Sequence, residues 1–211
     1  MKIGLLTTLF ALLAGCASYD TSSLHRKFYN VVTQGESKFN NLKYTRVKNI
    51  ACADDGTIIR MDLYQDEKQR QQDKIILTVK TPIHSSIATN NSLHFKIDGA
   101  TVGLSSIDKI TKTEKLTEFQ SAGSFYARGV YLPTIYAPAT YAATKRYIVN
   151  RALIERFTKA NTLLVKVDLE RSFIEGDCSI PVKSKEKEEY HQAAVEASGV
   201  YGFQEFIKAT K

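Results

Sequence analysis

The residue types that usually perform catalysis or bind metals are sparse and scattered in this chain. Its four histidines are His25, His84, His94 and His191. No two of them stand four residues apart, and no cluster of cysteines or carboxylates accompanies them, so the spacing of an ordinary zinc site is missing. The chain also lacks a glycine-rich loop of the kind that cradles phosphates. We therefore predict no metal site and no cofactor.

Two local groupings resemble fragments of an active site. His84-Ser85-Ser86 places a histidine beside hydroxyls, but no Gly-x-Ser-x-Gly motif surrounds them. Asp54-Asp55 and Asp177 offer carboxylates for a pair, yet both groups flank tight turns, where aspartate is common for conformational reasons. His94 lies on the outer face of an expected strand, where exposure to solvent explains it. The sequence therefore predicts no catalytic residues and a protein that is not an enzyme.

Cys16 has the most informative surroundings of any residue. It ends the motif Leu13-Ala14-Gly15-Cys16, which closes a short apolar run that follows the single charge of Lys2. The run is too short to cross a bilayer as a helix, which takes about 20 residues. A charge, an apolar run and small residues in this order are typical of a bacterial export signal. Because a cysteine directly follows Leu-Ala-Gly, the segment resembles the lipobox of bacterial lipoproteins.

The resemblance implies a covalent lipid anchor at Cys16. The sulfur receives a diacylglyceryl thioether, the peptide bond between Gly15 and Cys16 is cleaved, and the new amino group is acylated. Each buried methylene contributes about 0.8 kcal/mol, so several acyl chains hold a protein durably on a membrane. In Gram-negative lipoproteins an aspartate after the lipidated cysteine retains the protein at the inner membrane. Ala17 therefore favours the outer membrane, facing the periplasm.

The remaining chain shows no break in composition. Proline and glycine are few and scattered. We expect residues 1–15 to be the signal peptide, residues 16–23 to be the lipidated cysteine and a small, polar tether, and residues 24–211 to be a single globular domain.

If Cys16 carries lipid, two cysteines remain, Cys52 and Cys178. Two remaining thiols in an oxidising envelope favour a disulfide bond. Both residues flank expected turns, which would bring them to one end of the same sheet. The alternative is a pair of buried free thiols.

Tyrosines recur every five residues in one segment, at Tyr126, Tyr131, Tyr136 and Tyr141, with Arg128 among them. Five matches neither the helix period nor the strand period, so these rings cannot all face one core. Tyrosine is rigid and amphipathic, which suits a contact surface for a peptide or a sugar. These five residues are the candidate binding surface. Burial of two or three rings between sheet and helix is the alternative.

Alternating hydrophobicity predicts strands with one buried face. The apolar positions are Ile59, Met61 and Leu63; Ile75, Leu77 and Val79; Leu93, Phe95 and Ile97; and Leu163, Val165, Val167 and Leu169. The steps Asp55-Gly56 and Asp98-Gly99 suit two-residue hairpins. Together they predict an antiparallel sheet or sandwich built from meander hairpins.

Two segments follow the helical period instead. Residues 139–159 place apolar side chains on one side and charges on the other, which predicts an amphipathic helix. Arg146 and Asn150 fall on its apolar side, and a buried asparagine needs partners: loop carbonyls, a ligand or another chain. The tail from Lys185 is also helical, with Gly199 and Gly202 dividing it. The expected fold class is α+β.

The net charge of the chain is +7, and removal of the signal peptide would take away the positive charge of Lys2. A positive envelope protein can approach anionic headgroups, although a solvated surface explains the charge equally well. We expect a lipid-anchored, non-catalytic binding or structural module that contacts another envelope protein or a glycan, and no nucleic acid. The alternatives are a scaffold or pilot of a secretion, conjugation or pilus assembly, and an envelope hydrolase.

Overall fold

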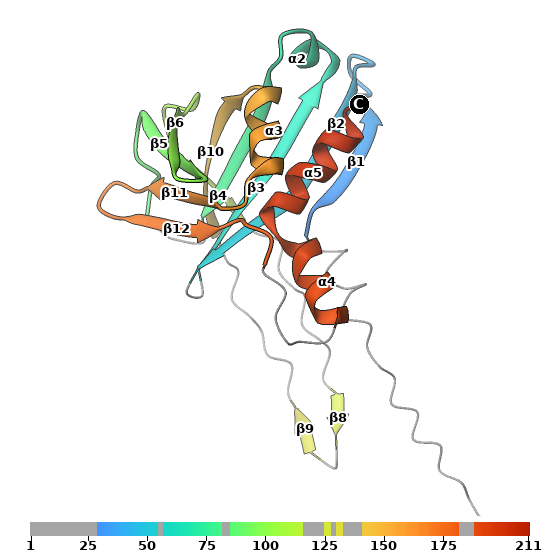
Figure 1. Ribbon diagram of the computed structural model, residues 1–211, viewed down its shortest axis with the longest axis vertical. Helices are drawn as coiled ribbons and strands as arrows, with labels where there is room; N and C mark the ends of the chain where they lie inside the picture. The colour runs from blue at the N-terminus through green and yellow to red at the C-terminus, as the bar shows by residue number, and fades with distance from the viewer. Residues whose placement is uncertain are drawn as a thin grey trace, which may run out of the picture.

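The computed structural model describes residues 29–54, 57–81, 85–115, 125–127, 130–132, 141–181 and 188–211 (Figure 1). The strands are β1 (Val31–Glu36), β2 (Lys43–Asp54), β3 (Thr57–Asp66), β4 (Ile75–Thr81), β5 (Asn91–Ile97), β6 (Ala100–Ser105), β7 (Lys112–Lys115), β8 (Phe125–Ala127), β9 (Val130–Leu132), β10 (Tyr141–Val149), β11 (Leu163–Asp168) and β12 (Phe173–Asp177). The helices are α2 (Glu67–Gln71), α3 (Arg151–Lys159), α4 (Glu188–Ala197) and α5 (Gly199–Ala209).

Ten of these strands form one antiparallel sheet in the order β6-β5-β11-β12-β2-β3-β4-β10-β7, with β1 paired to the first half of β2. A bridge between Ser106 and Tyr147 joins the residue after β6 to β10, so the sheet curls back toward itself. Strands β8 and β9 pair separately. The α+β class with a large antiparallel sheet is confirmed.

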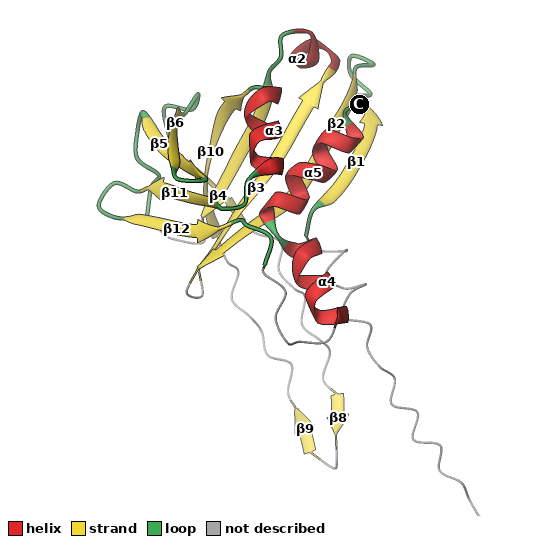
Figure 2. Ribbon diagram, in the orientation of Figure 1, coloured by secondary structure: helices red, strands yellow, loops and turns green. Residues whose placement is uncertain are grey.

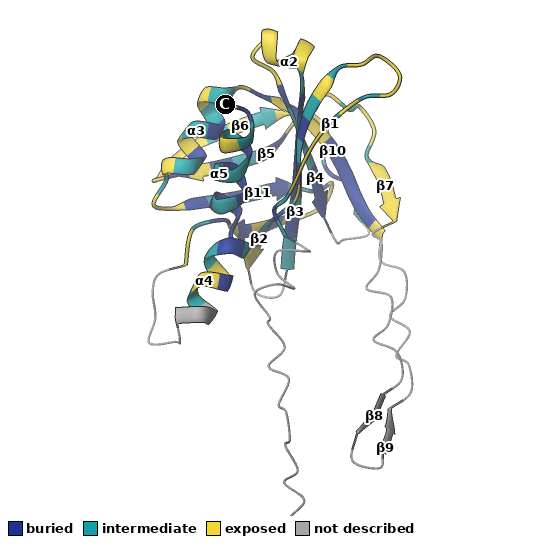
Figure 3. Cartoon of the chain, turned by 90° about the vertical axis from the view of Figure 1, so that its right-hand side faces the viewer, coloured by how far each residue is buried: buried dark blue, intermediate teal, exposed yellow. Residues whose placement is uncertain are grey.

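The alternating residues predicted to face the core are buried. Residues on β3, β4, β5 and β11 that were expected inward, such as Met61, Leu77, Phe95 and Val165, are at most 6% exposed. Their neighbours in the sequence face outward, as the period of two requires. Figure 3 shows buried residues along the central strands and exposed residues on α2 and β7.

The predicted helix over residues 139–159 is wrong in its first half. Tyr141–Val149 is strand β10, paired with β4 on one side and β7 on the other, and the helix α3 begins only at Arg151. Ala143, Tyr147 and Val149 point inward at a period of two. Pairing on both edges buries this strand, and that burial outweighs the helical pattern of its side chains.

Arg146 and Asn150 accordingly have other roles than the ones predicted. Asn150 is exposed and caps α3, accepting a hydrogen bond from the Leu153 N–H at 2.9 Å. Arg146 is half exposed and pairs with Asp108. Neither side chain lies on a buried helix face.

Helices α3 and α5 lie side by side over the inner face of the sheet (Figure 2). Phe157 of α3 joins them to the strands, since its ring centroid lies 4.4 Å from that of Phe95 and 5.0 Å from that of Phe203. The helical tail is divided in two as predicted, but at Ser198, which follows α4 and caps α5 through the Tyr201 N–H. Gly199 opens α5, whereas Gly202 lies inside this helix and does not divide the tail. None of the helices in the described part of the chain has the length and apolar character needed to span a bilayer.

Candidate functional site

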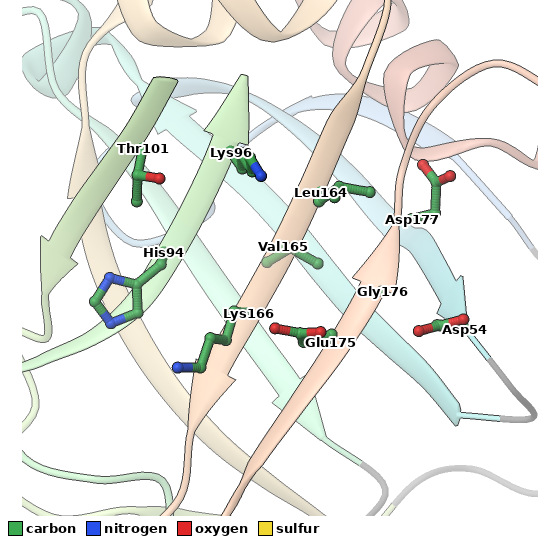
Figure 4. Close-up of a pocket in the computed structure, with 10 residues that line it drawn as sticks. All are labelled: Asp54, His94, Lys96, Thr101, Leu164, Val165, Lys166, Glu175, Gly176 and Asp177. Carbon is green, nitrogen blue, oxygen red and sulfur yellow. The ribbon is translucent and has the colours of Figure 1, made fainter. Parts of the chain in front are cut away.

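A cavity of about 450 Å³ opens on the outer face of the sheet, away from α3 and α5 (Figure 4). Strands β6, β5, β11 and β12 form its base, and the end of β2 closes one side. Its lining residues are Asp54, His94, Lys96, Thr101, Leu164, Val165, Lys166, Glu175, Gly176 and Asp177. The volume lies within the roughly 300–1,000 Å³ of typical small-molecule sites.

The strand period explains why polar side chains gather here. On β5 the residue Phe95 faces the core, so its neighbours His94 and Lys96 must face outward. The register then aligns two rows across the strands: His94, Lys166 and Glu175 in one, and Thr101, Lys96, Leu164 and Asp177 in the other. The rows place cations on β5 and β11 and carboxylates on β12.

The basic wall is organised by Asp168, at the end of β11. The His94 Nε2 atom lies 2.8 Å from Asp168 Oδ2, and the Lys166 Nζ atom lies 3.2 Å from Oδ1. Lys166 also lies over the ring of Phe173, 4.6 Å from its centroid. Burial alone would raise the pKa of Asp168, but the hydrogen bonds from His94 and Lys166 outweigh it and hold that pKa below its ordinary value.

The acidic wall consists of Asp54, Glu175 and Asp177. Only one Cα pair, Ala53 with Asp177, joins β2 to β12 at this point. Asp177 accepts a hydrogen bond from the Ser179 N–H at 2.7 Å. A side chain at Gly176 would meet the Cys52 carbonyl oxygen at 2.8 Å, so glycine is what lets these two strands approach.

The predicted disulfide is present and clamps this junction. Cys52 and Cys178 are bonded with an S–S distance of 2.02 Å, and both are fully buried. Asp54 lies two residues after Cys52, and Asp177 directly precedes Cys178. The bond therefore holds the acidic wall to the rest of the sheet.

The remaining predicted site residues are Cys16 and the five residues of the aromatic surface. Cys16, Arg128 and Tyr136 lie outside the described residues. Tyr126 of β8 and Tyr131 of β9 are partners in the register of that short pair. Tyr141 opens β10 and is 46% exposed. The aromatic binding surface therefore stays a prediction.

His84 and Asp55 also lie outside the described residues. Ser85 and Ser86 line a separate small cavity of about 120 Å³ together with Tyr141. His94 was expected to be simply solvent-exposed, but 24% of its side chain is accessible and it is paired with Asp168.

The side chains that line the cavity on the outer face offer mainly charged groups to a ligand. Thr101 supplies the one hydroxyl side chain among its lining residues, which include no serine or cysteine. Within the described residues no group of three or more histidine, cysteine, aspartate and glutamate side chains is placed to hold a metal ion. Among the site residues missed from the sequence, Lys166 and Asp168 are outward positions of β11, whose inward positions were predicted. Glu175 lies in strand β12, so the tight turn predicted at Glu175-Gly176-Asp177 is wrong.

No family model, curated protein or solved structure matches this chain.

Proposed function

We propose that this chain is a lipid-anchored lipoprotein of the cell envelope whose folded domain binds another envelope component, a protein or a glycan, without catalysing a reaction. The observation that carries the proposal is the division of its three cysteines. Cys52 and Cys178 form the disulfide, and Cys16 is left at the end of the lipobox-like motif. A disulfide suits an oxidising compartment, to which an export signal would deliver the chain.

The predicted lipid anchor and the folded domain are separated along the chain. The lipid on Cys16 would be separated from Tyr29, the first described residue, by a segment that begins with small and polar residues. Such a tether lets the domain contact partners near the membrane surface. Ala17 after the lipidated position favours the outer membrane, with the domain facing the periplasm.

A binding role is supported by the charged outer face of the sheet. The apolar face of this sheet packs against α3 and α5, whereas its other face carries a charged cavity open to solvent. Charged side chains at a concave surface select partners by complementary charge.

The scaffold alternative has less support. A scaffold would dock through an exposed apolar stripe on the helical tail, where the sequence predicts Tyr201, Phe206 and Ile207 as the docking face. Of these residues, Phe206 is buried in the protein's own core with Val200 and Phe203, and Tyr201 and Ile207 are partly buried. One observation favours the hydrolase alternative: His94 and Asp168 form a histidine–carboxylate pair beside the cavity. Thr101 supplies the one hydroxyl nucleophile among the residues that line this cavity.

The decisive experiment compares cysteine variants in intact cells. We expect Cys16→Ser to abolish palmitate labelling and to leave an unprocessed or soluble protein, as globomycin treatment of the unaltered protein should also do. The matched control is the double variant Cys52→Ser/Cys178→Ser, which loses the disulfide but should keep the label and sediment with membranes. A Cys16→Ser protein that is still labelled and still sediments would overturn the anchor.

Crosslinking in intact cells then tests the binding role. A stoichiometric envelope partner that is recovered with the unaltered protein supports it. Hydrolysis of an envelope substrate that is lost in His94→Gln would replace it with the hydrolase alternative.

A further inference from the structure

The cavity on the outer face of β5, β11 and β12 has charged side chains that find no counter-charge among the described residues. Among the described residues, Lys96, Glu175 and Asp54 enter no ion pair and no side-chain hydrogen bond. By contrast, Lys166 and His94 already share Asp168. The charges open to a ligand are therefore one ammonium on β5 and carboxylates on β12 and β2.

These charges stand on opposite sides of an apolar floor. Leu164 of β11 lies between Lys96 and Asp177 in the register, and Figure 4 shows it between them. Neighbouring strands are about 4.8 Å apart, so β5 and β2 are separated by roughly 14 Å across β11 and β12. A chain of three or four residues in extended form covers about the same length.

We propose that this cavity binds a short zwitterionic peptide, with its amino end against Glu175, Asp54 and Asp177 and its carboxylate against Lys96. The inference deepens the proposed binding function and rests on it, because it names the ligand chemistry of the same cavity. The peptide backbone would cross the strands over Leu164, where its apolar parts lose contact with water.

Other ligand classes match this arrangement less well. A simple anion would meet Lys96 but also three carboxylates, and like charges at such distances repel. A neutral oligosaccharide would leave both walls without counter-charges after displacing their water. A zwitterion satisfies both walls at once, and the apolar floor suits the short segment between its charges.

The test is a calorimetric titration of the full-length protein in detergent at low salt. The probe is the peptide Lys-Ala-Ala-Ala with free termini, and the comparison ligands are its C-terminally amidated form, chitotetraose and inorganic phosphate. We expect the free peptide to bind, amidation to weaken it about three- to tenfold, and the last two to show no binding.

Two cavity variants test which side of the cavity binds each end of the peptide. Glu175→Gln should weaken both the free and the amidated peptide about three- to tenfold. Lys96→Gln should weaken the free peptide by a similar factor and leave the amidated one unchanged. Glu36→Gln on β1 and the exposed Lys109→Gln are matched controls outside the cavity, and both should bind like the unaltered protein. All four are exposed positions, so far-ultraviolet circular dichroism should be unchanged.

Binding of chitotetraose but not of the peptide would overturn the inference, as would peptide affinity that neither Glu175→Gln nor Lys96→Gln alters. These outcomes differ from failure of the anchor, which appears only as a change in labelling and sedimentation. If the peptide does not bind but crosslinking recovers an envelope partner, the binding role stands and this ligand class is excluded.

Discussion

The carboxylate of Asp108 accepts hydrogen bonds from both the side chain and the backbone N–H of Arg146. The Arg146 Nη2 atom lies 2.7 Å from Asp108 Oδ1, and the backbone nitrogen of Arg146 lies 2.8 Å from Oδ2. The Asp108 side chain is 9% exposed, although that of Arg146 is 48% exposed. The pair thus ties the loop after β6 to strand β10, next to the bridge between Ser106 and Tyr147 that draws the curled sheet together.

This contact predicts a pH-dependent contribution to stability. The guanidinium and the N–H of Arg146 outweigh burial and lower the pKa of Asp108. A carboxyl with a lowered pKa stabilises the fold above its ordinary pKa of about 3.9, and this stability is lost as the pH falls through the lowered value. We expect Asp108→Asn to cost about 1 kcal/mol at neutral pH and progressively less in acid. Urea unfolding at neutral pH and in acid measures this cost, with Glu36→Gln as the control. An equal cost under the two conditions would contradict the prediction.

Lys145 predicts a second rise of stability with pH, in the alkaline range. Its side chain is 1% exposed, and Nζ donates to the Ala88 carbonyl oxygen at 2.9 Å. Burial lowers the pKa of Lys145, opposed in part by Asp108 and Glu170. Between this lowered value and the ordinary value of about 10.4, the unfolded chain binds more protons, so stability rises with pH.

We expect Lys145→Met to remove that rise, seen as a flatter dependence of the urea midpoint on pH above neutrality. The exposed Lys109→Met is the control and should keep the dependence of the unaltered protein. Identical curves for the Lys145 variant and the unaltered protein would show that burial does not disfavour its charge.

The disulfide should contribute substantially to stability, because Cys52 and Cys178 are separated by 126 positions. Closing so long a loop is worth about 4–5 kcal/mol in the chain-entropy model, and measured values are often lower. We expect Cys52→Ala/Cys178→Ala to lose about 2–5 kcal/mol of unfolding free energy. Guanidinium titration checks this, and a loss below about 1 kcal/mol would mean that the loop is constrained by other contacts.

Phe157 should be among the most costly residues to truncate. It is fully buried between Phe95 and Phe203, so Phe157→Ala would leave a cavity where sheet, α3 and α5 meet. We expect a loss of about 3–5 kcal/mol by thermal or urea unfolding. Phe39→Ala removes a fully exposed ring and should change stability by less than about 0.5 kcal/mol. Equal effects would contradict this placement of the core.

Gly199 tests the packing of α5 against the disulfide. A Cβ atom there would lie 2.7 Å from Cys178 Cβ and 2.9 Å from Cys52 Sγ, and neither can move freely. We expect Gly199→Ala to cost about 1–3 kcal/mol. At Gly103 the added atom meets only the end of the exposed Asn91 side chain, which can swing away. Gly103→Ala should therefore be nearly neutral, and a reversed order would contradict the argument.

The sequence predicted β3, β4, β5 and β11, but it placed a turn where β12 alternates between a buried and an exposed face. In these four strands the fully buried residues of the core face alternate with mostly polar residues of the other face. The prediction was wrong for β10, where Ala142, Ala143, Thr144 and Lys145 are all buried and the alternation is hidden. Only pairing with β4 and β7 identifies that segment as a strand.

The alternation also indicated that His94 faces outward, and the count of cysteines indicated the bond between Cys52 and Cys178. Both inferences need only local patterns or composition. That His94 meets Asp168, 74 positions later, depends on β5 lying beside β11 in one particular register. Long-range strand pairing is selected by packing of the whole core, and no local pattern carries it. The residues of the cavity were therefore present in the sequence, but only the tertiary structure decided that they form one site.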